Sequence, residues 1–148
     1  MIIYKELNRA HIREIAEIYV DAFNSEPWND EWTVESASKR ISQMINCEGF
    51  YGLVAYEDER LIGMILGNHE YYYNGMHFNI KEFCVDLKLR GKGTGSKLFE
   101  EFIKRLKCRG IDEVILLTSK TDGTEGFYKK HGFKGFEGMV IMGKKIND

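Results

Sequence analysis

The sequence predicts a single α/β domain over residues 1–148, with the element order β-α-α-β-β-β-α-β-α-β-β. Its length, with 43% hydrophobic and 30% charged residues, suits one globular domain with a single substantial core. Apolar residues recur at helical spacing in some segments and form strand-like runs in others. In residues 79–110, an apolar strand leads through three glycines into an amphipathic helix, and the other elements are organised around this stretch.

The first third of the chain is predicted to hold a short edge strand, residues 1–6, and two helices. Asn8 can cap the first helix. Its apolar face is Ile12, Ile15, Ala16, Tyr19 and Phe23. The segment 24–32 breaks the helical pattern and contains the only proline, and a second helix starts at Thr33 and ends near Gly49. The residues expected to point inward from this second helix are Val34, Ala37, Ile41, Met44 and Ile45.

Three strands are predicted next, at residues 50–56, 61–71 and 76–86. A charged turn at residues 57–60 separates the first two, and Asn74-Gly75 is a strong hairpin signal before the third. The helix after the glycines ends at Gly110. Its buried residues are expected to be Leu98, Phe99, Phe102, Ile103 and Leu106.

The last part of the chain is predicted to contain one more helix and three strands. The apolar run 114–117 has the pattern of a strand covered on both faces. A short helix over residues 123–131 then precedes two final strands, at residues 133–136 and 139–144.

Composition excludes several classes of protein. A net charge of −2 gives no bulk attraction to nucleic acid. The three cysteines lack metal-ligand spacing and are expected to be reduced thiols, and no metal site is predicted. No apolar run approaches the length of a membrane span, and the N-terminus does not have the pattern of a signal peptide. We therefore expect a cytoplasmic protein with neither nucleic-acid nor membrane partners.

The glycine turn has the features of a pyrophosphate cradle. Gly91, Gly93 and Gly95 allow a tight turn and a close approach of the backbone to a ligand. The helix that follows offers unpaired N–H groups and the positive end of its dipole. The spacing G-x-G-x-G fits neither a Walker A loop nor a Rossmann fingerprint.

Two motifs resemble the GNAT superfamily of acyl-CoA N-acyltransferases. Arg90, Gly93 and Gly95 match [QR]-x-x-G-x-[GA], the acyl-CoA pyrophosphate motif of that family, and residues 126–133, GFYKKHGF, resemble its F-Y-x-x-x-G-F signature. The resemblance covers residues 62–141, and the N-terminal third matches only in layout. It implies a mixed, mostly antiparallel sheet of six to seven strands, splayed between the fourth and fifth, with about four helices around it.

The resemblance implies acetyl-CoA as the cofactor, with its pantetheine between the splayed strands. Backbone N–H groups at Phe83, Cys84 and Val85 would then face the thioester and pantetheine, and Tyr128 would lie near the CoA sulfur. The pyrophosphate would be held by the backbone of Arg90, Gly91, Lys92, Gly93, Thr94, Gly95 and Ser96.

The reaction implied by the resemblance is amide formation from a thioester, which needs a neutral amine and a protonated leaving thiolate. Tyr128 is the candidate general acid. Glu82 is the candidate base, directly or through a water chain, and Glu70 and His69 are rival bases. Because the family transfers the acetyl group directly, a covalent intermediate on Cys84 is not expected.

The acceptor is expected to be a small cationic primary amine, of aminoglycoside or polyamine type. The family uses the segment between the first two helices as an acceptor wall, and acidic groups among aromatic rings suit a cation. The expected substrate-binding residues are Glu26, Trp28, Asp30, Glu31 and Glu70. Acetylation of a protein lysine or N-terminus, or a non-catalytic acyl-CoA-binding module, stays an alternative, and a homodimer is left open.

Overall fold

The structure is a computed structural model that describes residues 1–147. The chain forms two compact units, of which the first is Met1–Leu116 and the second begins at Leu117. The strands are β1 (Ile2–Glu6), β2 (Phe50–Glu57), β3 (Arg60–Tyr72), β4 (Gly75–Val85) and β5 (Glu113–Leu116). The α-helices are α1 (Ile12–Phe23), α2 (Val34–Ile45), α3 (Thr94–Cys108) and α4 (Glu125–Lys130), and two short 3-10 helices are η1 (Arg9–His11) and η2 (Leu87–Leu89).

The first unit contains one mixed sheet with the order β1-β2-β3-β4-β5. The first four strands pair antiparallel, and β5 pairs parallel with β4, so the predicted mixed and mostly antiparallel α/β fold is confirmed. The β4–β5 ladder runs only from the pair His77 and Glu113 to the pair Ile80 and Leu116. Since β4 continues to Val85, its last five residues extend past β5, and the opening that the family resemblance implies lies between these two strands.

A β-bulge at Lys81 changes which face each side chain of β4 occupies. Leu66 pairs with Glu82 while Gly67 pairs with Ile80, so Lys81 has no opposite residue on β3. Successive side chains of a strand point to opposite faces of the sheet. The extra residue therefore brings Phe83 to the same face as Phe78 and leaves Glu82 on the other face. Gly67 permits the bulge, since a Cβ there would collide with the backbone of Asn79.

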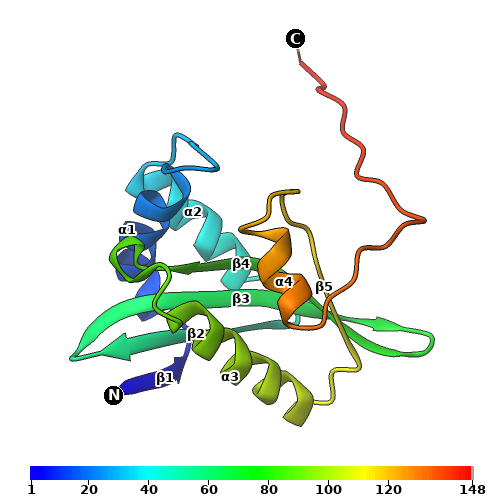
Figure 1. Ribbon diagram of the computed structural model, residues 1–148, viewed down its shortest axis with the longest axis horizontal. Coiled ribbons are helices and arrows are strands. Elements are labelled where there is room, and N and C mark those ends of the chain that lie inside the picture. Colours follow the sequence, from blue (N-terminus) through cyan, green and yellow to red (C-terminus); the bar gives the residue numbers. More distant parts are fainter. Residues whose placement is uncertain (148) are drawn as a thin grey trace. The chain divides into compact units, whose positions relative to one another are not determined.

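The helices lie on both faces of the sheet, with α1 and α2 on one side and α3 on the other (Figure 1). Asn8, predicted to cap the first helix, caps the short helix η1 that leads into α1, and its side chain accepts from Ala10 N–H. Thr33, predicted as the start of the second helix, is the N-cap of α2, and its side chain accepts from Ser36 N–H. The predicted inward position of Val34 is wrong. Val34 is 42% exposed, because it lies in the first turn of α2 and only the later turns pack on the core.

The second unit contains the short helix α4, which lies within the predicted range 123–131. The two final strands expected at residues 133–136 and 139–144 are absent from the described residues, so the strand count is five and not six to seven. A strand needs a ladder partner, and residues 133–147 form none. Three glycines in this stretch, Gly135, Gly138 and Gly143, further weaken its tendency to form strands.

Among residues 1–147, no helix has both the length and the apolar character that a membrane crossing requires.

Candidate active site

Hydrogen bonds between its two ends stabilise the loop between α1 and α2. The side chain of Asn24 accepts from Trp32 N–H and donates to the Trp32 carbonyl, both at 2.8 Å. Asp30 N–H donates to the carbonyl of Phe23, and Trp28 N–H donates to that of Ser25. These contacts hold the aromatic and acidic residues of the loop at fixed positions over the end of α1.

Aromatic rings pack this loop on α1. The Tyr19 ring lies 4.6 Å from that of Phe23 and edge-on to Trp32 at 5.1 Å, and Phe23 lies 5.0 Å from Trp28. Edge-to-face pairs at these distances stabilise the packing beyond simple burial. Trp28 and Trp32 are therefore partly buried and stabilise the loop, and part of each side chain stays accessible to a ligand.

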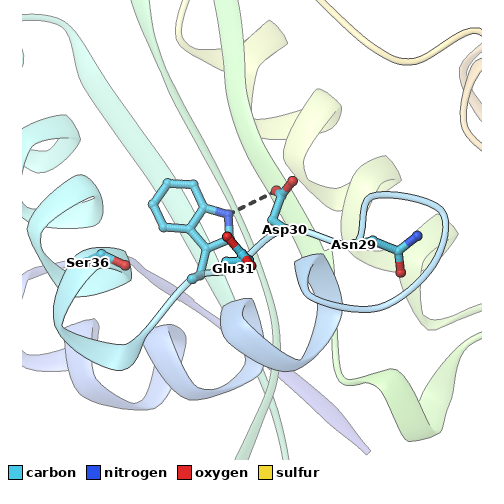
Figure 2. A pocket seen from close by; sticks show the side chains of 5 residues that line it. Asn29, Asp30, Glu31 and Ser36 are labelled. Carbon is cyan, nitrogen blue, oxygen red and sulfur yellow. Dashed lines mark hydrogen bonds between the residues drawn. The ribbon is translucent and has the colours of Figure 1, made fainter.

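An open pocket lies on this loop and the first turn of α2. Its lining residues are Asn29, Asp30, Glu31, Trp32 and Ser36. Figure 2 shows Asp30 accepting a hydrogen bond, which comes from the Trp32 indole N–H at 3.0 Å. Asp30 and Glu31 are exposed, so the pocket presents two carboxylates beside an indole ring. Such a surface suits a cation.

Glu82 lies buried on β4 between two partners from the helices above it. Its Oε1 accepts a hydrogen bond from Arg40 Nε of α2 at 2.7 Å and from the Tyr19 hydroxyl of α1 at 3.2 Å. The Arg40 guanidinium also lies 6.0 Å from the centre of the Trp32 ring. Trp32 contacts both partners of Glu82, and through them the carboxylate is connected to the pocket.

Burial raises the pKa of Glu82 above its ordinary value. The hydrogen bond and charge of Arg40 oppose this rise, as does the Tyr19 hydroxyl, whereas the nearby charge of Asp30 adds to it. The pKa of Tyr19 is raised as well, first by burial and then by the charge of Glu82, so Tyr19 keeps its proton and acts as a donor. A carboxylate with a raised pKa, partly compensated by a cation, suits general base catalysis near neutral pH.

Cys84 lies two residues after Glu82 and belongs to the hydrophobic core. Burial, with the charge of Glu82, raises the pKa of its thiol, so the reactive thiolate is disfavoured. Its environment is that of a small apolar core residue.

The glycine turn has the backbone geometry of an anion cradle. Gly91 and Gly93 have φ angles of 78° and 81°, in the left-handed region that favours glycine. Gly93 is the N-cap of the 15-residue helix α3 and has no side chain to accept from its first turn. The positive end of the helix dipole therefore lies at a turn whose N-cap residue has no side chain to cover it, which fits the pyrophosphate of an acyl-CoA.

The cradle lies against the last residues of β4. A Cβ built on Gly95, in the first turn of α3, would lie 3.6 Å from the Phe83 ring and 3.9 Å from Val85. The structure thus brings together two of the predicted cofactor segments, the strand end and the turn. Thr94 is buried at the start of α3, and Lys92 is exposed.

The side chain of Arg90 connects the glycine turn to the loop between α1 and α2. It donates to the carbonyls of Ala22 at 3.0 Å and Glu26 at 3.2 Å. Its guanidinium lies 5.6 Å from the centre of the Trp28 ring. This arrangement directs the Arg90 guanidinium toward the loop between α1 and α2.

Glu70 lies away from Glu82 on the sheet. Glu70 pairs with His77 and Glu82 with Leu66, so the backbone positions of Glu70 and Glu82 are about 13 Å apart along the strands at the usual rise per residue. Glu70 is exposed and accepts a hydrogen bond from Asn79 Nδ2 at 2.5 Å. Contacts through Tyr19, Arg40 and Trp32 therefore connect Glu82 to the pocket, whereas Glu70 contacts Asn79.

Tyr128 belongs to α4 in the second unit. Its ring lies 5.3 Å from that of Phe127 and 5.8 Å from that of Phe133, and its carbonyl accepts from Phe133 N–H at 3.0 Å. These contacts fold the GFYKKHGF segment around its own aromatic residues.

Sequence reasoning missed Arg40, Tyr19 and Asn24 as members of the site. A signal for the first two exists in the helical pattern. Arg40 directly precedes the buried Ile41 on the inward side of α2, and Tyr19 carries a hydroxyl on the apolar face of α1. A charged or hydroxyl-bearing side chain on such a face needs a buried partner.

A model of the Acetyltransferase (GNAT) family matches residues 12–133. The chain therefore belongs to the GNAT family of acetyltransferases, whose members take the acetyl group from acetyl-CoA. No curated protein sequence matches the chain.

Solved structures share the fold. A possible acetyltransferase from Clostridium difficile 630 superposes with a TM-score of 0.81 at 18% identity, over 99% of each chain. A predicted acetyltransferase from Clostridium acetobutylicum, solved with acetyl-CoA, gives 0.73 at 18% identity, over 97% of this chain and 96% of the other. An aminoglycoside acetyltransferase from an uncultured soil metagenomic sample gives 0.74 at 14% identity, over 99% of each chain. Identities this low establish the fold alone.

Proposed function

We propose that this protein transfers the acetyl group of acetyl-CoA directly to a primary amine of a small cationic molecule, of aminoglycoside or polyamine type. The observation that carries the proposal is the connection of buried Glu82, through Tyr19, Arg40 and Trp32, to a pocket with two exposed carboxylates. Cationic amines would bind at Asp30 and Glu31, and the reacting amine would pass its proton to the base, Glu82. The aminoglycoside acetyltransferase with the same fold is consistent with this substrate class.

Glu82 acts as the base in this proposal. An amine that arrives as an ammonium ion cannot attack a carbonyl until it loses a proton. The Glu82 carboxylate accepts that proton, which then passes to solvent through the open pocket. The neutral amine is left with a free electron pair and attacks.

The residues proposed to hold acetyl-CoA are the cradle and the end of β4. Backbone N–H groups of residues 90–96 would hold the pyrophosphate, and those of Phe83, Cys84 and Val85 would hold the pantetheine arm. Bound there, acetyl-CoA supplies the acetyl thioester. The GNAT match spans residues of both compact units, and we propose that the two make one catalytic domain.

Tyr128 is proposed as the general acid that gives a proton to the departing thiolate. Tyr128→Phe is expected to lower kcat on the order of 10²-fold, within the range for general acid–base catalysis, with nearly unchanged CoA affinity. Steady-state kinetics and calorimetry with CoA measure the two quantities. A wild-type kcat in a step limited by chemistry would remove Tyr128 from the mechanism.

Neutralising the acidic loop is expected to weaken binding of the amine alone. The variant Glu26→Gln, Asp30→Asn, Glu31→Gln should raise the KM of a polycationic amine roughly three- to tenfold, because each exposed charge contributes little. Asn at position 30 keeps an oxygen for the Trp32 indole. The KM of acetyl-CoA should stay near its original value, and the effect should shrink at high salt.

A matched control changes the same number of charges in the turn between β2 and β3. The variant Glu57→Gln, Asp58→Asn, Glu59→Gln should leave the KM of the amine unchanged. If the loop variant keeps the original KM for its best amine at low salt, this loop is not the acceptor wall.

A screen of amine acceptors with acetyl-CoA tests the proposed substrate class. Release of the CoA thiol is measured for each acceptor. Aminoglycosides and polyamines should give the highest kcat/KM, and acidic peptides the lowest. Preference for a lysine side chain or N-terminus of a basic peptide would favour a protein acetyltransferase. Binding of acetyl-CoA without turnover on any amine would favour a binding module.

A further inference from the structure

We infer that Arg40 and Tyr19 are positioning residues that hold one oxygen of Glu82 in place and leave the other to accept the proton of the amine. The inference rests on the proposed function, because it takes Glu82 as the base. It concerns side chains on three separate elements, α1, α2 and β4.

The two oxygens of Glu82 have different surroundings. Oε1 receives both hydrogen bonds, from Arg40 Nε at 2.7 Å and from the Tyr19 hydroxyl at 3.2 Å. Within residues 1–147, no hydrogen bond to Oε2 is formed. Yet no fully buried side-chain nitrogen or oxygen in this described range lacks a partner, so Oε2 is within reach of solvent. The carboxylate thus has one fixed oxygen and one accessible oxygen.

The two donors are themselves held in place. Tyr19 is 2% exposed, and its ring is fixed between Phe23 and Trp32. The Arg40 side chain is 38% exposed and lies near the Trp32 ring, while Trp32 is tied by two hydrogen bonds to Asn24. The position of Glu82 is therefore set by two groups that both contact Trp32, a lining residue of the pocket.

Arg40 also controls when the base is available. Three groups act on the charge of Glu82: Arg40 from α2, Tyr19 from α1 and Asp30 from the loop. On β4 itself, Cys84 is affected by the charge of Glu82 in turn. Burial raises the pKa of Glu82, and Arg40 provides the largest opposing effect. Without the guanidinium the carboxyl group would keep its proton up to a higher pH. The enzyme would then lose more activity on the acid side than on the alkaline side.

The kinetic test compares Arg40→Gln with Arg40→Lys and with Lys39→Gln. Lys39 is an exposed neighbour on α2 and controls for a change of charge on that helix. For Arg40→Gln, we expect kcat/KM to fall more at pH 6 than at pH 9, by up to about tenfold for each unit by which the carboxyl pKa rises when the opposite charge is lost. Arg40→Lys should recover much of the acid-side activity, and Lys39→Gln should match the wild type.

A second measurement needs no acceptor. The ¹³C signal of the Glu82 carboxyl, assigned by its loss in Glu82→Gln, is titrated in the wild type, Arg40→Gln and Tyr19→Phe. Its midpoint should move to higher pH in both variants, and further in Arg40→Gln. An unmoved midpoint together with an equal loss of kcat/KM at every pH would overturn the inference. A moved midpoint in an enzyme that acetylates no amine would contradict the proposed function alone.

Discussion

Replacing Glu82 by Gln should lower kcat about 10³-fold with acetyl-CoA affinity nearly intact. Gln has the same shape as Glu and can accept the hydrogen bonds of Arg40 and Tyr19 at its carbonyl oxygen, but it cannot take a proton from the amine. Arg40 loses its ion-pair partner yet remains 38% exposed, so water can solvate its charge and the fold should be kept.

Two comparisons make this prediction specific. Glu17→Gln removes an exposed carboxylate of α1 that forms a 3.9 Å ion pair with Arg13, and it should leave kcat unchanged. Glu70→Gln tests the rival base on β3 and is expected to have a much smaller effect than Glu82→Gln. A loss of activity in Glu70→Gln with near-normal turnover in Glu82→Gln would reassign the base.

The change Gly93→Val should weaken CoA binding by about 10²-fold or more. At φ 81° a branched side chain is strained, and any shift of the turn misaligns backbone N–H groups that would face the pyrophosphate. Losing one or two hydrogen bonds to a charged group accounts for this factor. Calorimetry with CoA measures it directly.

Gly110→Val provides the matched control. Gly110 has φ 84° and lies just beyond the other end of α3. A Cβ added to Gly110 would meet no atom within 4 Å, and the same holds for Gly93. Both variants should lose similar thermal stability, but Gly110→Val should bind CoA normally. Unchanged CoA affinity in a folded Gly93→Val variant would refute the cradle.

Local signals predicted most of the first unit. Asn8 and Thr33 mark the starts of helical segments, Gly110 follows the end of α3, and Asn74-Gly75 connects β3 to β4, because caps and turns depend on neighbouring residues. The glycine turn was placed correctly between β4 and α3 for the same reason. Glu82 was found only through the resemblance to the family.

Features that depend on distant residues were missed. The bulge at Lys81 arises from the pairing of β4 with β3, and no local pattern marks it. Tyr19 and Arg40 lie 63 and 42 residues from Glu82 in sequence, so their convergence is a property of the packed fold. The final strands predicted at residues 133–136 and 139–144 depend on a ladder partner elsewhere in the chain, and none is formed among the described residues.

Direct transfer of an acetyl group to a cationic amine fixes the stoichiometry of the reaction, which can be measured. CoA thiol and acetylated amine are measured together at saturating acetyl-CoA while the concentration of a polyamine or aminoglycoside is raised. We expect thiol release that depends on the amine, with one acetylated amine formed for each thiol. Bound acetyl-CoA that releases no thiol with any cationic amine would contradict it.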